Sequence, residues 1–341
     1  MSARYLELSQ PELESKAQQA YEVYRECQVC PHACGVDRTQ GETGFCGQTD
    51  FLQVSSSVRH FGEEPPLVGS RGVGNLFVTG CNMRCDYCQN FQISQLWKKR
   101  ADASEIEQSY QSVARQMVRL QEEGAHFIGW VSPSHVVPGL LKSLSIACER
   151  GLRIPIIYNS NGYDALPTLK LLDGVVDIYL PDLKYAHSST AKEISHIKKY
   201  PEFSRQAVLE MYRQVGPLVL DEDELAEQGV LVRHLLLPED LAGTWETLCF
   251  IALELSPSVP LSLMSQYRPV HKAMNRPQLD REITSEEYDK AITMARELGF
   301  ENLYLQSMET TLHNLPDFDN TDDPFPLDCT HNKENAETLP G

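Results

Sequence analysis

From about residue 74 onward, short apolar runs alternate with amphipathic stretches along the chain. The runs are rich in Val, Ile, Leu and Tyr and mostly apolar at successive positions, as is typical of strands buried on both faces of a parallel sheet. They cover residues 75–80, 126–131, 154–159, 175–180, 230–237, 259–264 and 302–306. Because the stretches between them carry helix signals, the pattern predicts βαβ units. Six or seven such repeats favour a complete or partial barrel over a short open sheet.

Three helix starts are marked by a hydroxyl side chain followed three residues later by a glutamate, the spacing of a capping box. The pairs are Ser9 with Glu12, Ser104 with Glu107, and Thr284 with Glu287. The second pair precedes an apolar stripe that begins at Ile106 and stops before Gly124. We expect a helix after each pair, the last of them ending near Gly299.

The composition disfavours two classes of partner. The chain has 341 residues, with 30 Lys and Arg against 48 Asp and Glu, and a formal net charge of −18. Nucleic-acid affinity rests largely on basic side chains that neutralise phosphates, so we expect no nucleic-acid partner. The N-terminus has no signal-peptide pattern, and no stretch has the roughly 18–20 continuous apolar residues that a membrane span needs. We therefore expect a cytoplasmic protein with no membrane partner, in which clustered cysteines indicate metal or redox chemistry.

Residues 307–341 differ from the rest of the chain in composition. They carry one Lys against eight Asp and Glu and include four prolines. We expect them to form a disordered acidic tail. The segment ENLYLQS (301–307) resembles a protease-cleavage linker used in expression constructs, but it also completes a helix-to-strand unit, so we treat it as native.

Seven of the ten cysteines fall into two groups, and the second group directly follows the apolar run 75–80. It reads Cys81-x3-Cys85-x2-Cys88. Three thiolates on one tight loop can hold three irons of a [4Fe–4S] cluster, which leaves the fourth iron without a protein ligand. An open position of this kind lets a metal centre bind a substrate or cofactor directly. The structural alternative is a zinc ion held by these thiolates and a distant residue such as His60, although zinc sites more often use paired C-x2-C units.

With Tyr87 before its last cysteine, this group resembles the signature of radical S-adenosylmethionine (SAM) enzymes. Other segments are similar to the poorly characterised branch of that superfamily related to pyruvate formate-lyase activating enzyme. These segments are CQVCPHACGVDR (27–38), HFGEEPPLVGSRG (60–72), CQNFQIS (88–94), YNSNGY (158–163), DIYLPDLKY (177–185), RHLLLP (233–238) and MSQYRP (264–269). The resemblance covers roughly residues 25–306 and excludes the tail.

The resemblance implies an α/β fold, a partial (β/α)6 TIM-like barrel with the cluster loop after its first strand. It implies a [4Fe–4S] cluster, SAM as cofactor, and an electron donor such as flavodoxin or ferredoxin. Reductive cleavage of SAM would give a 5′-deoxyadenosyl radical that abstracts hydrogen from a substrate. The substrate, whether a small molecule, a peptide or a protein, is not specified by the sequence.

Five residues just past the apolar runs are the SAM candidates that the resemblance implies. Ser132 lies in VSPSH (131–135), where the family's relatives carry a Gly-Gly-Glu segment for the methionine amine. Asn159 and Ser160 match the positions near the ribose. Asp182 and Lys184 match positions that face SAM, and a lysine suits its carboxylate. Each of the five could instead be an ordinary turn residue or a barrel-rim ion-pair partner.

A basic pair, Arg233 and His234, lies within the apolar run 230–237. A charged side chain in such a run is costly unless it is paired, so we expect Arg233 to meet a carboxylate inside the barrel, from the protein itself or from a ligand. His234 fits a hydrogen-bonded core histidine as well as it fits a catalytic group.

The first cysteine group is Cys27-x2-Cys30-x3-Cys34-x11-Cys46, in a segment with turn-forming proline and glycines. Four thiolates suffice for a closed metal site. They could hold a second [4Fe–4S] cluster, a structural Zn ion, or no metal, because the spacing does not discriminate among these.

We expect four parts along the chain: an N-terminal helix (1–26), a Cys-rich metal-binding extension (27–59), a radical SAM partial barrel (60–306) and the acidic tail (307–341). The predicted function is that of a radical SAM enzyme acting on an unidentified substrate. One alternative is activation of a glycyl-radical enzyme, although the Asp-Gly-Pro-Gly-Ile-Arg-like segment of such activases is replaced here by EEPPLVGSRGVGN (63–75). An alternative of another class is a non-catalytic iron–sulfur protein for electron transfer or sensing.

Overall fold

A curved, mostly parallel sheet forms the centre of the molecule. The computed structural model describes residues 2–99, 107–308, 315–320 and 322–325. Within these residues the parallel strands are β2 (Val73–Val78), β4 (Phe127–Val131), β5 (Ile156–Ser160), β6 (Ile178–Pro181), β8 (Ala226–Val230), β9 (Val232–Leu235), β10 (Leu261–Met264) and β11 (Leu303–Leu305). All seven apolar runs therefore contain or overlap strands, and the predicted partial barrel is confirmed.

The strands pair in two sheets that meet near Arg233. One sheet has the order β2-β4-β5-β6-β8 in its parallel part, and the other has the order β9-β10-β11. A backbone bridge between Asp182, just after β6, and Arg233 on β9 joins the two. Antiparallel strands extend the first sheet: β1 (Leu52–His60) and β3 (Glu107–Gln108) beyond β2, and β7 (Val219–Leu220) beyond β8.

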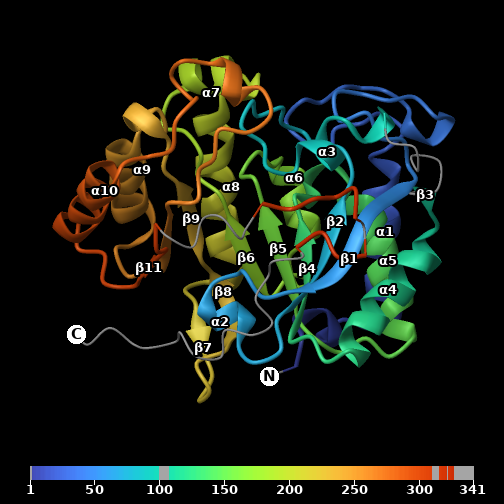
Figure 1. Cartoon of the computed structure of the whole chain (residues 1–341). Helices are drawn as coiled ribbons and strands as arrows, with labels where there is room; N and C mark the ends of the chain where they lie inside the picture. The colour runs from blue at the N-terminus through green and yellow to red at the C-terminus, as the bar shows by residue number, and fades with distance from the viewer. Residues whose placement is uncertain (1, 100–106, 309–314, 321, 326–341) are drawn as a thin grey trace.

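Helices cover the outer, convex side of the sheet (Figure 1). They are α1 (Gln10–Glu22), α4 (Tyr110–Glu122), α5 (Val137–Glu149), α6 (Leu166–Leu171), α8 (Tyr200–Val215), α9 (Thr244–Phe250) and α10 (Ser285–Glu297). Short helices α2 (Pro65–Val68), α3 (Phe91–Ser94) and α7 (Ser188–Ser195) lie in loops. No helix among the described residues is long and apolar enough to cross a membrane.

Alternate residues of each strand face opposite sides of the sheet, as the pleat requires. On β4, Ile128 and Trp130 belong to the large core shared with α4 and α5. Phe127, on the same strand, packs instead in a smaller cluster with Ile157 on β5 and Leu231 between β8 and β9. That second cluster fills one end of the barrel interior, so the polar residues at the carboxyl ends of the strands occupy the other.

Two of the three predicted capping boxes are present, at Ser9 with Glu12 and at Thr284 with Glu287. The third helix start is wrong, because Glu107 lies in strand β3 and pairs with Gln53 of β1. Helix α4 begins later and is capped by Ser109, whose hydroxyl accepts a hydrogen bond from the backbone N–H of Ser112. Strand pairing with β1 takes Glu107 out of the helix. Ser104 lies outside the described residues.

The Cys-rich segment packs directly onto the cluster loop. Gly80, two residues after the end of β2 and at a φ of +70°, lies so close to this segment that a Cβ there would stand 2.7 Å from the carbonyl oxygen of Cys46. Part of the range expected as a disordered tail also has defined contacts, since Phe318 and Phe325 are buried. The segment that carries them, residues 315–320 and 322–325, crosses in front of the central strands and is drawn red in Figure 1.

Candidate active site

The three cysteines of the second group lie on the loop between β2 and α3, at the carboxyl end of a parallel strand. This is the end of a barrel at which βα loops converge. Asp86, between Cys85 and Cys88, is fully buried and forms ion pairs with Arg276 at 2.5 Å and His196 at 3.0 Å. The backbone carbonyl of Asp86 also accepts hydrogen bonds from Lys272 and Ala273. The loop is therefore held from two separate elements before any metal is considered.

Each of the three sulfurs has a polar neighbour on another residue. The Sγ of Cys81 accepts from the backbone N–H of Met83 at 3.3 Å and from the amide of Asn161 at 3.5 Å. Ser195 donates to the Sγ of Cys85 at 2.9 Å, and Ser94 lies 3.2 Å from that of Cys88. Hydrogen bonds to sulfur tune iron–sulfur clusters, so these contacts fit a cluster held by the loop.

Burial makes these thiols weak acids on their own. It raises the pKa of the Cys81 thiol to about 12 and that of the Cys85 thiol to about 11, while the charge of Lys184 lowers both. A coordinating metal deprotonates its thiol ligands outright. The loop can therefore present three thiolates when a cation shares the site.

The zinc alternative lacks the grouping it would need. Among the described residues, no three His, Cys, Asp or Glu side chains come together as ligands of one metal ion. His60 lies against the ring of Phe325, with 4.4 Å between ring centroids, and does not line the cavity at the cysteines. In a [4Fe–4S] cluster, by contrast, each thiolate binds a different iron.

The three cysteines and four of the five SAM candidates line one cavity of about 190 Å³. The four are Ser132, Asn159, Asp182 and Lys184. Ser132 sits in the left-handed region at a φ of +52° and donates its backbone N–H to the carbonyl of Asn159 at 2.8 Å. Ser134, the other serine of VSPSH, is buried outside the cavity lining.

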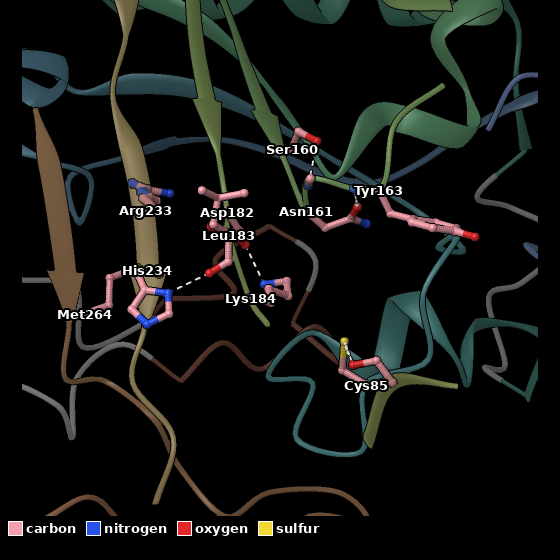
Figure 2. Close-up of polar contacts among 12 residues, drawn as sticks. Cys85, Ser160, Asn161, Tyr163, Asp182, Leu183, Lys184, Arg233, His234 and Met264 are labelled. Atoms are coloured by element: carbon pink, nitrogen blue, oxygen red, sulfur yellow. Dashed lines mark hydrogen bonds and ion pairs between the residues drawn. The ribbon is translucent and has the colours of Figure 1, made fainter. Parts of the chain in front are cut away.

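Ser160 is the candidate that the structure places elsewhere. Its hydroxyl donates to the buried carboxylate of Asp164 and accepts from the backbone N–H of Gly162 at 2.9 Å. The next residue, Asn161, which is drawn near Ser160 in Figure 2, lines the cavity instead. It also donates to Asn82 at 2.7 Å. The motif YNSNGY was recognised in the sequence, but the turn decides which of its side chains faces the cavity.

Lys184 and Asp182 form an ion pair at 2.5 Å on the cavity wall after β6. Burial by itself lowers the pKa of the lysine, but the neighbouring Asp182 carboxylate raises it above its usual value. Lys184 therefore keeps its charge inside the cavity. Figure 2 shows the pair beside Arg233 and His234 of the adjacent strand.

Arg233 meets two carboxylates of the protein, as its position within an apolar run predicts. Its Nε donates to Glu64 at 2.8 Å, and its guanidinium also pairs with Glu63. Asn75 on β2 donates to Glu63 at 2.8 Å. Although burial raises the pKa of the Glu63 carboxyl, the charge of Arg233 lowers it to about 2. The trio forms a charged layer across the interior, and Arg233 also lines the cavity.

His234 is a hydrogen-bonded core histidine. It is fully buried, with Nδ1 2.6 Å from the carbonyl of Leu183 and Nε2 3.1 Å from the hydroxyl of Thr244. Burial lowers its pKa. Both ring nitrogens are occupied, which leaves the side chain without a place in the cavity chemistry.

The four cysteines of the first group line a single small cavity of about 10 Å³. The group is Cys27, Cys30, Cys34 and Cys46. Arg38 lines it too, and donates to the carbonyls of Thr49 at 2.9 Å and His135 at 2.7 Å. Burial raises the pKa of Cys46. The fold thus brings together thiols that are 19 positions apart in the chain.

A short chain of contacts links the two cysteine groups. The ring of His32 stacks on Phe45 with 3.9 Å between centroids, and its Nε2 lies 2.9 Å from the carbonyl oxygen of Asn82. Asn82 follows Cys81 directly. Arg84 of the cluster loop donates to the carbonyl of Phe45 at 3.0 Å.

Further cavity residues come from the last position of β10 and the loop after it. Met264, Gln266, Tyr267 and Arg268 line the same space as the cysteines. The motif MSQYRP (264–269) supports the family resemblance, but its residues were not among the predicted site residues. The available signal was their place after an apolar run, which is the same signal that selected the other candidates.

No protein-family model matches the chain. The uncharacterized protein MJ0674 of Methanocaldococcus jannaschii is 31% identical to it over 296 residues, which are 86% of this chain and 80% of that protein.

Three solved structures are similar in shape. Streptococcus suis SuiB has a TM-score of 0.45 at 11% identity and matches 69% of this chain, which spans about half, 50%, of SuiB. HydG, a maturase of the [FeFe]-hydrogenase, has a TM-score of 0.47 at 11% identity over 88% of this chain and 63% of its own. Methylornithine synthase (PylB) has a TM-score of 0.42 at 10% identity over 87% of this chain and 82% of its own. Likenesses of this size carry no argument about function.

The charged layer predicts a pH dependence of stability. Because folding depresses the pKa of Glu63, its contribution is complete above the ordinary value of about 4.5 and is lost as the pH falls towards 2. We expect Glu63 to account for a loss of about 2 kcal/mol between pH 6 and pH 3. Urea unfolding from pH 6 to 3 measures this, and Glu63→Gln should give a shallower dependence than the exposed control Glu122→Gln. Parallel curves for the two variants would contradict the assignment.

Proposed function

The chain belongs to the family of the uncharacterized protein MJ0674, and we propose that it is a radical SAM enzyme that binds a [4Fe–4S] cluster through Cys81, Cys85 and Cys88. The observation that carries the proposal is the cavity of about 190 Å³ that these cysteines share with Asp182 and Lys184. The three-cysteine motif by itself would assign the cluster ligands and leave the residues that bind SAM unassigned. The relation to pyruvate formate-lyase activating enzyme rests on the sequence segments and is part of the proposal.

The donor set fits the cofactors that the proposal names. Three thiols on one loop, with no fourth cysteine of the described part of the chain lining the cavity, leave one iron of a cluster open. The chemistry supplied by the bound cluster and SAM is one-electron cleavage of the S–C5′ bond of SAM, followed by hydrogen-atom abstraction from a substrate. A reductant such as flavodoxin or ferredoxin would supply the electron.

The protein's own residues bind and orient the cofactor. Lys184 keeps a positive charge in the cavity and is suited to the SAM carboxylate. Asn159 and Asn161, from the carboxyl end of β5 and its following turn, present amide groups to the same space. Gly162 makes the turn possible, because at a φ of +79° a Cβ would stand 2.3 Å from the carbonyl oxygen of Asp182. With Asn161 in the cavity, the ribose contact passes from Ser160 to its neighbour.

The first cysteine group supports a second proposed metal site. Four thiols line one cavity next to the cluster loop, and His32 and Asn82 connect the two groups. Among the described residues no three of these thiols, like those of the cluster loop, stand together as ligands of one metal ion, so a bound metal would draw them into a tighter arrangement. A second [4Fe–4S] cluster, a structural zinc ion and no metal remain the three alternatives.

Loss of the cluster ligand Cys85 should abolish SAM cleavage. Protein reconstituted anaerobically with iron and sulfide, then given dithionite and SAM, should release 5′-deoxyadenosine, which chromatography quantifies. Cys85→Ala should form less than about a hundredth of that amount, because an iron would lose its only protein ligand. Cys249→Ala, outside both groups, is the matched control. Equal product from Cys85→Ala and the unmodified chain would rule out the proposal.

Loss of the Lys184 charge should weaken SAM binding about 10- to 100-fold, the usual range for a charged hydrogen bond. Calorimetry of reconstituted Lys184→Met against the exposed control Lys192→Met measures the difference. Because Lys184→Met leaves Asp182 unpaired, the double variant Asp182→Asn with Lys184→Met is a second test that removes both charges. Unchanged affinity in the folded variants would remove Lys184 from the site.

A chain without the loop cysteines should still bind metal if the second site exists. We expect Cys81→Ala, Cys85→Ala and Cys88→Ala combined to retain iron with sulfide, or zinc, when purified anaerobically. Addition of Cys30→Ala should remove that metal, because Cys30 is among the most buried thiols of its group. Elemental analysis with an absorption spectrum identifies the metal. A metal-free triple variant that remains folded would exclude the site.

A further inference from the structure

The acidic C-terminal segment, residues 315–325, carries two buried aromatic side chains. Phe318 is 0% exposed and Phe325 is 9% exposed. Its aspartates at 317, 319, 322 and 323 are all exposed. The aspartates of this segment therefore face solvent, whereas its two phenylalanines pack against the barrel.

The two rings enter the barrel beside the cysteine cavity. Phe77 on β2 contacts both, with 5.2 Å between its ring centroid and that of Phe318 and 5.5 Å to that of Phe325. Val131 and Ile93 complete the cluster. Val131 also lines the cavity at Cys81, Cys85 and Cys88. One residue thus forms a wall common to the two spaces.

Gln92 holds the segment through one contact to its backbone and one to a side chain. Its amide oxygen accepts from the N–H of Phe318 at 2.9 Å, and its amide nitrogen donates to the carboxylate of Asp317 at 3.0 Å. Gln92 lies on α3, four residues after Cys88. A single side-chain amide therefore offers a donor and an acceptor to a polypeptide next to the cluster loop.

The segment is folded on itself and not woven into the sheet. The N–H of Asp317 donates to the carbonyl of Pro324 at 2.8 Å, and that of Asn320 to the carbonyl of Asp317 at 3.1 Å. Among the described residues it forms no strand with either edge of the barrel. Removing it would leave the strand pairing of the barrel intact and would uncover Phe77, Val131 and Ile93 together.

We propose that this apolar surface is a docking groove for a polypeptide substrate, and that residues 315–325 occupy it when no substrate is bound. The groove already accepts a polypeptide: Gln92 accepts from one backbone N–H and donates to the carboxylate of the preceding residue, and Phe77 with Val131 receives two aromatic side chains. The expected substrate segment is a turn with aromatic residues about seven positions apart, as Phe318 and Phe325 are. This inference rests on the proposed function, because the adjoining cavity is where the hydrogen atom would be abstracted.

Binding of the segment in trans tests the groove without requiring catalysis. The probe is a fluorescein-labelled peptide of residues 315–325, and the protein is the full chain carrying Phe318→Ala and Phe325→Ala. Fluorescence anisotropy should give a Kd at least fivefold lower for this variant than for the unmodified chain, whose own segment competes. Leu315→Ala, at an exposed position of the same segment, should behave like the unmodified chain. A probe with alanine at both phenylalanine positions should bind none of them.

Equal affinity for the double variant and the unmodified chain, or equal binding of the alanine-substituted probe, would overturn the groove. The single variants Phe318→Ala and Phe325→Ala replace the double variant if it does not fold. Gln92→Ala added to the double variant should weaken probe binding at least fivefold, and unchanged binding would remove Gln92 from the groove. Formation of 5′-deoxyadenosine by the same reconstituted proteins separates the two proposals. Probe binding without 5′-deoxyadenosine would contradict the proposed enzyme activity, and 5′-deoxyadenosine without probe binding would contradict the docking groove.

Discussion

The buried ion pairs of Arg233 with Glu63 and Glu64 connect the two sheets and the segment after β1 at one point. The backbone of Arg233 bridges the two sheets at Asp182, and its side chain reaches the segment that follows β1. A guanidinium taken from water among apolar strands is costly, and it is tolerated because two carboxylates pair with it, one of which also accepts a hydrogen bond from Asn75. The same residue lines the cavity, so the residue whose backbone joins the sheets also places a charge beside the site.

Above that layer, the site is assembled from loops that would be independent of one another in an unfolded chain. The cluster loop is held at Asp86 by the segment 272–276 and by His196, and its sulfurs meet Asn161 and Ser195. Lys184 opposes the raised pKa values that burial gives the thiols. The cavity is consequently organised by protein contacts in advance of any cofactor, which is what allows a site to orient a reactive group.

Two segments far apart in the sequence both contact the elements around this cavity. The Cys-rich segment contacts the cluster strand and loop through His32 and Cys46, and residues 315–320 contact β2 and α3 through Phe318. Their compositions differ, one rich in cysteine and the other in aspartate, yet each is fixed by a few specific contacts beside the cluster loop.

The sequence by itself determined the strands, the barrel class and the three cysteines, because buried parallel strands and clustered thiols leave local patterns that a short window contains. It also predicted that Arg233 would meet a carboxylate, since burial of an unpaired charge is prohibitive. Tertiary structure decided which carboxylates those are, and that Asn161 and not Ser160 faces the cavity. It also decided that α4 begins after Ser109, because Glu107 finds a strand partner 54 positions away in Gln53. Tertiary structure likewise decided that Phe318 and Phe325 are buried. The acidic composition of residues 307–341 predicts exposure of the segment as a whole, whereas burial of these two side chains needs the apolar surface that the fold supplies.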